Sequence, residues 1–553
     1  MRYALVLTAA AFFAPIALSA DPPAPPITFQ TQPANRVLGD LRAAADLIGG
    51  AKAVKALNDS IKERFGEKGF NGLDMIRPVV GYVNLAPKPE DITAVIAFPI
   101  TNEKDFLALC ERFNKGKPED LGKGLYQLPP LDPQYKARMR FSEQYAYISY
   151  GSKPEPALEA KALVPANKLY DPADQALFAG KLHFDRLTPE VKLAAAKGLE
   201  DFKKALDFGN GRGGFGIGAQ EAAVFKPLVE EFEKMVGRYF LLLGGGDTAT
   251  LRLNLDVPTG DLSIDAALKG KPDSALSKAI AGFKPVGNKF AGLLGPDTAV
   301  GFKTRLPFFN DELKTGAAKS LEEGQKLVPA NDPSKALADE IFKGLIRTVK
   351  TGEVDIVGAV RGPNKDGDFS VVAAGAFEGT TALEKEFKAF VEKNAPENEQ
   401  ERFKWSADKA GAINIHTYKM AGGNFFDVTK PFGGDKCVIA FAFAPKGVFV
   451  AVGTDAVTVV KDALTVKAAD APVIDIVVNP DRLVKLIEKA GGPAAQVERV
   501  LGKEDKLVSA MSLAVSGGKE LKVRYAINLR ILPPALFTSL EEGEGAADPL
   551  EKK

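Results

Sequence analysis

Hydrophobic positions along this chain recur with two periods, and the resulting elements follow one another in an order that repeats once. Around a Pro258-Thr259-Gly260 turn, apolar residues occupy alternate positions through most of 251–268. A second hairpin with the same alternation spans 513–529, around Gly517-Gly518. Side chains two apart in a strand share one face of a sheet, so each hairpin is expected to have one buried and one solvated face.

Two amphipathic helices are predicted, each directly after a strand. After the strand at 91–98, apolar residues at i, i+3, i+4 and i+7 form one face of a helix that ends near Phe113. After the strand at 369–377, Thr381 and Glu384 predict a capping box ahead of a second apolar face. The same strand-to-helix step therefore occurs in both halves of the chain.

Further segments match in the same order. The strand at 145–152 parallels 448–454, and the sequence HFDRL at 183–187 parallels NPDRL at 479–483. Strands joined by tight turns favour antiparallel pairing, with helices packed on the sheet. We therefore predict an α+β fold of two tandem, duplicated units, in which amphipathic helices pack on antiparallel hairpin sheets.

Helical stretches at 38–65 and 311–350 are expected to lead into the two units. The predicted divisions are a signal peptide at 1–20, a Pro-rich, extended and poorly ordered linker at 21–36, unit 1 at 37–284, unit 2 at 285–541 and a polar tail at 542–553.

The overall plan resembles secreted proteins of planctomycete-type bacteria, of unassigned function. Two passages carry the resemblance: ITAVIAFPITNEKDFLALCERF at 92–113 and TATLRLNLDVPTGDLSIDAALKGKPDSALSKAI at 248–280. The resemblance implies export, and it brings no catalytic or binding residues with it.

The first residues have the form of a secretory signal peptide. Met1-Arg2-Tyr3 is a short positive start, the run from Ala4 to Leu18 is uncharged and apolar, and the small pair Ser19-Ala20 follows. An uncleaved membrane anchor is the alternative, but the run is short for a bilayer and contains Pro15. No later segment is long and apolar enough to span a membrane, so a periplasmic or secreted location is expected.

Composition narrows the class of protein. A chain of 553 residues is too long for one ordinary core, and 45% apolar with 26% charged residues is normal for a globular protein. The net charge of +1 does not favour nucleic acid, whose phosphates require clustered Lys and Arg. Two cysteines are too few for a disulfide-stapled scaffold.

Only two histidines occur, at His183 and His416. In both predicted strands the histidine alternates with apolar neighbours, which places it on the polar side, so both are expected to be solvated. They occupy different elements of the repeat and form no symmetric pair. A zinc site of two or three histidines is therefore not expected.

The cysteines are expected to be buried free thiols. Cys110 continues the apolar face of its helix, and Cys437 begins an apolar strand. A disulfide between the two units is the alternative that export would permit. Neither cysteine has a neighbouring histidine to activate it as a nucleophile.

Other motifs have structural interpretations. The glycines at 209–214 match G-x-G-x-x-G but follow a Lys-rich helix rather than a strand, so a loop is predicted. Residues 364–368, NKDGD, are expected to be a hairpin turn rather than a calcium loop. Ser-x-x-Lys occurs at Ser406 and Ser516 without partner motifs. Tyr145 and Tyr147 share one strand face, where ordinary packing is expected and stacking against a sugar or peptide is the alternative.

No catalytic, cofactor-binding or metal-binding residue is assigned, and no cofactor is expected. The sequence favours an exported, non-catalytic protein with a binding or structural role and an unknown partner in the cell envelope. Two alternatives stay open, a carboxylate-dependent hydrolase of an envelope polymer and a carrier of an apolar ligand. The hydrolase predicts a deep cleft with two facing acids, and the carrier predicts a continuous apolar cavity.

The signal peptide gives a direct prediction. Peptide-bond cleavage after Ala20 should leave a mature chain that begins with Asp21. N-terminal sequencing of the protein from the exported fraction checks this. A chain that retains residues 1–20 and stays in the membrane fraction would contradict it.

Overall fold

The computed structural model describes the following residues: 24–86, 88, 91–129, 135–194, 224, 226–228, 230–231, 234, 243–282, 287–306, 311–420, 429–501 and 505–532. The predicted signal peptide, the glycine motif at 209–214 and the polar tail lie outside them.

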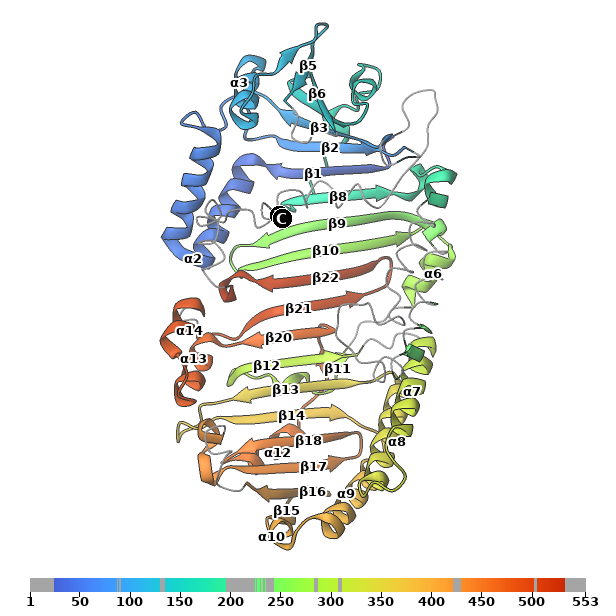
Figure 1. Ribbon diagram of the computed structural model, residues 1–553, viewed down its shortest axis with the longest axis vertical. Coiled ribbons are helices and arrows are strands. Elements are labelled where there is room, and N and C mark those ends of the chain that lie inside the picture. Colours follow the sequence, from blue (N-terminus) through green and yellow to red (C-terminus); the bar gives the residue numbers. More distant parts are fainter. Residues whose placement is uncertain are drawn as a thin grey trace, which may run out of the picture.

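Twenty of the described strands form one antiparallel sheet, separate from the pair of β11 (Gly287–Asn288) and β19 (Ala469–Asp470), and Figure 1 shows them lying across the long axis of the molecule. In spatial order they are β4 (Glu119–Asp120), β5 (Leu125–Leu128), β6 (Lys136–Ser142), β7 (Tyr145–Gly151), β3 (Thr93–Pro99), β2 (Pro78–Asn84), β1 (Ile27–Pro33), β8 (Phe178–His183), β9 (Gly246–Asp256), β10 (Asp261–Gly270), β22 (Leu521–Asn528), β21 (Val508–Ser516), β20 (Ile474–Val478), β12 (Thr298–Arg305), β13 (Asp355–Arg361), β14 (Ser370–Ala376), β18 (Gly447–Gly453), β17 (Val438–Ala444), β16 (Ile413–Lys419) and β15 (Phe403–Ala410).

The helices are α2 (Ala34–Phe65), α3 (Glu103–Asn114), α6 (Ala275–Ala281), α7 (Asp311–Lys326), α8 (Lys335–Thr351), α9 (Thr380–Asn394), α10 (Glu397–Gln400), α12 (Ala456–Leu464), α13 (Pro480–Lys489) and α14 (Ala494–Leu501). Short 3-10 helices include η2 (Glu155–Leu158), η3 (Ala166–Lys168) and η4 (Phe184–Arg186). This mixture of helices with a large antiparallel sheet confirms the α+β class. No helix in the described ranges is long and apolar enough to cross a membrane.

The two halves of the sheet, which meet where β10 pairs with β22, have the same strand order. Read outward from that pair, the first half runs β10, β9, β8, β1, β2, β3, β7, β6, β5, β4, and the second runs β22, β21, β20, β12, β13, β14, β18, β17, β16, β15. Helices occur at matching places. The hairpin of α7 and α8 follows β12, and α2, which bends at Gly50, follows β1.

The expectation of a poorly ordered linker at 21–36 is wrong for most of its length. Ile27–Pro33 is β1, and it pairs with both β2 and β8 inside the first half of the sheet. Ile27 and Phe29 belong to a hydrophobic cluster with residues of the neighbouring strands, such as Val83 on β2 and Leu182 on β8. The Pro-rich sequence at 22–26 indicated a linker, although the residues directly after it alternate as in an ordinary strand.

The capping box predicted at Thr381 and Glu384 is also wrong. Helix α9 begins after Gly379, whose φ of 91° is left-handed, and no side chain caps it. Glu384 instead pairs with Lys388 and with His416. The apolar face of this helix is confirmed, because Leu383 and Val391 are buried.

Both ends of the sheet are covered on both faces. We call the two faces the α12 face and the α9 face, after the helices that cover them in the second half. On the α12 face, α12 covers a core of alanines and valines in the second half, and residues 155–170 cover the matching strands in the first. On the α9 face, α3 covers β5, β6, β7 and β3, while α9 packs over β15, β16 and β17. The six central strands lie between these covered ends.

One local packing arrangement occurs in both halves. Phe29 on β1 lies opposite Gly81 on β2, and Phe302 on β12 lies opposite Gly358 on β13. In each pair the aromatic ring occupies the space that a Cβ atom would need if the glycine were replaced by another residue. The glycine is therefore required because an aromatic ring crosses its strand.

Gly81→Ala should destabilise the fold by about 1–3 kcal/mol, because the new methyl group would overlap the Phe29 ring and lie 2.5 Å from the Val95 carbonyl oxygen. Urea denaturation of the full chain measures the change. Gly375→Ala is the matched control, because that strand glycine has open space around it. Equal loss in both variants would contradict this explanation.

Candidate functional site: the two faces of the central strands

The six central strands, β9, β10, β22, β21, β20 and β12, carry opposite chemistry on their two faces. Directly paired residues of antiparallel strands lie on the same face, so the register extends each row of side chains across the sheet. On the α9 face the rows are apolar, and on the α12 face they are largely polar or charged.

Three parallel rows make up the apolar part of the α9 face, which we call the apolar platform. Its residues are Leu251, Ala266, Val523 and Val515 in one row, Leu253, Ile264, Tyr525, Leu513 and Ile474 in the next, and Leu255, Leu262, Ile527, Met511, Ile476 and Phe302 in the third.

The platform is exposed, contrary to the expectation that the apolar side of each hairpin is buried. Leu251 is 49% exposed, Ile264 45%, Phe302 45% and Tyr525 40%. The other members are all partly exposed. The hairpins themselves are confirmed at β9–β10 and β21–β22. Alternation therefore predicted which residues share a face, but not that the apolar face would lie open.

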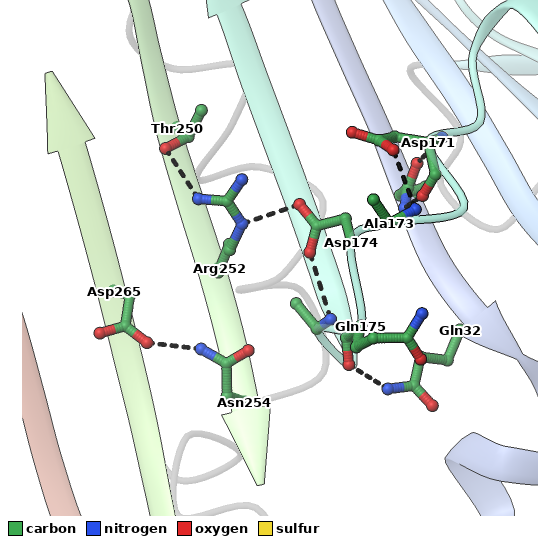
Figure 2. Close-up of polar contacts among 11 residues, drawn as sticks. Gln32, Asp171, Ala173, Asp174, Gln175, Thr250, Arg252, Asn254 and Asp265 are labelled. Carbon is green, nitrogen blue, oxygen red and sulfur yellow. Dashed lines mark hydrogen bonds and ion pairs between the residues drawn. The ribbon is translucent and has the colours of Figure 1, made fainter. Parts of the chain in front are cut away.

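The α12 face of the same strands holds a network of charged and amide groups, part of which Figure 2 shows. Arg252 Nε lies 2.7 Å from Asp174 Oδ2, and Asn254 donates a hydrogen bond of 2.5 Å to Asp265 Oδ2. Asp265 also lies 3.4 Å from Arg524 Nη1 across the joint between the halves. These acids therefore each face a cation or an amide.

The second half continues this pattern. Asp475 on β20 is nearly buried, lies 3.1 Å from Lys303 Nζ on β12, and accepts a hydrogen bond of 2.6 Å from the Ser509 hydroxyl. A general acid and base need carboxylates that are free to exchange a proton with a substrate. On this face, Asp174, Asp265 and Asp475 are instead held by neighbouring donors.

A loop at 171–175 is fixed at the edge of this polar face. Gln30 on β1 accepts from the Asp171 N–H at 2.7 Å and donates to the Asp171 carbonyl oxygen at 2.9 Å. Gln32 donates to the Gln175 carbonyl oxygen (Figure 2). A cavity of about 320 Å³ lies beside the loop. It is lined by Thr31, Gln32, Pro33, Asn35, Arg36, Ile76, Tyr170, Asp174 and Gln175.

The prediction that His416 is solvated is wrong. Its side chain is 0% exposed and lies under α9, near the rings of Trp405 and Phe441. A bulge in β15 gives Ser406 a φ of 54°, and the Ser406 N–H donates to His416 Nδ1 at 3.0 Å. The imidazole proton is therefore on Nε2, which donates to Glu384 Oε1 at 3.1 Å.

The two histidines do not form a joint site. His183 is half-buried in β8 of the first half, and His416 lies in β16 near the far edge of the second half. Burial lowers the pKa of both. No group of three or more His, Cys, Asp or Glu side chains suited to a metal ion occurs among the described residues.

Both cysteines are buried and free, as predicted. Burial raises the pKa of the Cys110 thiol to about 12 and also raises that of Cys437, so neither forms a thiolate at neutral pH. The rings of Tyr145 and Tyr147 pack as expected, with Tyr147 buried and its hydroxyl accepting from the Ala166 N–H at 3.1 Å.

The segment at 364–368 is confirmed as a turn. It joins the paired strands β13 and β14, and the Asn364 side chain accepts from the N–H groups of Asp366 and Asp368. Of the Ser-x-x-Lys serines, Ser406 lies in the β15 bulge and Ser516 ends β21.

Comparison of the chain with protein-family models, with curated proteins and with solved structures finds no match.

The buried His416 predicts a pH dependence. Its pKa is lowered by burial and by Lys388, with Glu384 opposing, so the folded state holds fewer protons than the unfolded state just below pH 6.5. Stability should therefore fall as pH drops from 7 towards 5. His416→Gln should weaken this slope while costing about 1–3 kcal/mol at pH 7.5, because the Ser406 N–H loses its partner. Urea titrations across this pH range measure both effects, and an unchanged slope would contradict the assignment.

Proposed function

We propose that this protein is an exported, non-catalytic binding protein that docks a macromolecular partner on the apolar platform. The observation that carries the proposal is the exposure of Leu251, Ile264 and Tyr525 on adjacent strands. Soluble proteins rarely expose contiguous apolar patches of more than a few hundred Å², and larger ones mark interaction surfaces.

The size of the platform fits a protein interface. Six strands at about 4.8 Å spacing extend about 24 Å, and three rows two residues apart extend about 14 Å along the strands. With a margin of side chains, this area can supply the dry centre of an interface that buries about 800 Å² on each partner. Tyr525 and Phe302 provide the large rings that dominate such centres.

The shape supports a macromolecule over a small apolar ligand. Small ligands bind in concave sites that bury most of their surface. The cavity of about 320 Å³ beside the loop at 171–175 has a lining rich in polar groups, and a shallow hollow of about 620 Å³ is lined by α2 residues alone, so neither includes a platform residue. The carrier alternative therefore has less support than the docking of a partner with a matching apolar surface.

The hydrolase alternative also has less support. A hydrolase of this kind needs two carboxylates that both contact the polymer and are not already held in ion pairs. On the polar α12 face, Asp174 is paired with Arg252 and Asp475 with Lys303. Each of these carboxylates would have to leave its cation before it could contact a substrate.

The proposal includes an origin by internal duplication and a location in the periplasm or outside the cell. The identical strand order of the two halves and the repeated Phe–Gly pairs support the duplication. The amino-terminal sequence and the resemblance to secreted planctomycete-type proteins support export.

Ile264→Asp/Tyr525→Asp should abolish partner binding, because two charges would be placed at the centre of a dry contact. Envelope proteins from the native cells are captured on the purified full chain and quantified by mass spectrometry. Partners bound by the wild type should be depleted at least about tenfold on the double variant, an expected loss of about 1.4 kcal/mol or more.

Leu327→Asp is the matched control, because Leu327 is 53% exposed and lies outside the platform. This variant should retain the partners. Far-ultraviolet circular dichroism should show that all three proteins are folded. If the double variant captures the same proteins in the same amounts as the wild type, the platform is not the docking surface.

A further inference from the structure

Two arginines and a serine lie together near the outer end of the first half of the sheet. Arg138 and Arg140 are two residues apart on β6, and Ser149 on β7 lies directly opposite Arg138. All three are on the α12 face. Side chains in these positions begin within about 7 Å of one another, so they share one small region.

Each of the three has a buried polar atom without a hydrogen-bond partner among the described residues. These atoms are Arg138 Nη1, Arg140 Nε and Ser149 Oγ. Ser149 is 0% exposed, and the Arg138 side chain is 12% exposed. Buried donors are almost always satisfied, and an unpaired one costs about 1–3 kcal/mol, more when it is charged.

The charges in this region are unbalanced. Arg138 Nε lies 2.8 Å from Glu155 Oε1, at the start of η2. No ion pair of Arg140 with another described residue occurs, so the ion pairs of the described residues match these two guanidinium groups with one carboxylate. A buried guanidinium N–H without an acceptor is unfavourable, and the oxygens of a bound anion would remove that cost.

The second half shows that the fold does not need these polar groups. By the strand register, Arg138 corresponds to Ala440, Arg140 to Ala442, and Ser149 to Ala451. These three alanines are 0% exposed and form part of the core under α12. The same framework is thus closed with methyl groups in one half and with two guanidinium groups and a hydroxyl in the other.

We propose that Arg138, Arg140 and Ser149 form a binding site for a small inorganic oxyanion, phosphate or sulfate. Guanidinium N–H groups match the geometry of such oxygens, and the Ser149 hydroxyl adds a third donor. The donor atoms are buried beneath residues 155–158, which favours a free ion over a phosphate or sulfate group on a polymer. Glu155, more exposed than Arg138, lies beside the ion and holds Arg138 in place.

Isothermal titration calorimetry and thermal melting of the full chain test the site with sodium phosphate and sodium sulfate. Sodium chloride at equal ionic strength is the reference. Phosphate or sulfate should bind with one site per chain and raise the melting temperature by roughly 2 °C or more at saturating concentration. Arg140→Ala and Ser149→Ala, which install the residues of the second half, should each weaken binding by at least about tenfold.

Arg42→Ala is the control, because Arg42 is an exposed arginine of α2 whose Nε bonds Asn58, and this variant should keep the full response. If Arg140→Ala does not fold, Ser149→Ala decides, since it removes only one oxygen. A response no larger than that of chloride, or one that both variants retain, would overturn the proposal. In that case water satisfies these donors.

Discussion

The main-chain pairing of β10 with β22 is the interaction on which the rest of the structure depends. It joins the two halves through eight paired positions, from Asp261 with Asn528 to Leu268 with Leu521. This register places Ile264 beside Tyr525 and Asp265 beside Arg524. A shift of one residue would put the leucines and isoleucines of one hairpin opposite the charges of the other. The continuity of the apolar platform and of the polar face from one half to the other therefore follows from this one set of backbone hydrogen bonds.

Local alternation allowed much of the fold to be predicted from the sequence. The hairpins at β9–β10 and β21–β22, the strand-to-helix steps at α3 and α9, and the turn at 364–368 all depend on neighbours within about 20 residues. Strand β1 could not be recognised in the same way, because its partners β2 and β8 are about 50 and 150 residues away and Pro-rich sequence precedes it.

The prediction of a solvated His416 was wrong for a related reason. Alternation put it on the polar side of a strand whose other side is apolar too, since α9 and α12 cover both faces there.

The alternation within the hairpins predicted which residues of the central strands lie on the polar face. It could not predict which residues elsewhere in the chain pair with them. Arg252 finds Asp174 in a distant loop, and Asp265 finds Arg524 across 259 residues of sequence. The anion site has the same origin. Arg138 and Ser149 are ordinary residues of two adjacent strands, and only the comparison with Ala440 and Ala451 through the strand register marks them as unusual. The two halves have the same strand order. When corresponding positions are buried in both halves but polar or charged in only one, the polar residue is not needed for the fold and points to a separate function.

Covered ends and an open centre explain how one sheet can be both stable and available for binding. The cores under α3, α12 and residues 155–170 bury the apolar side chains that stabilise each half. The central strands are stabilised mainly by their ladders and by cross-strand pairs, and their apolar face is exposed, as the proposed docking of a partner requires.

Thiol labelling of single-cysteine substitutions measures most directly whether that face is open. The variants are made in a chain whose Cys110 and Cys437 are replaced by alanine. The structure predicts that Ile264→Cys reacts with a maleimide within a factor of about ten of the unfolded chain, while Ser263→Cys, next to it and 1% exposed, is strongly protected. Equal protection at both positions would mean that the apolar platform is covered in the native protein, and would contradict the account given above.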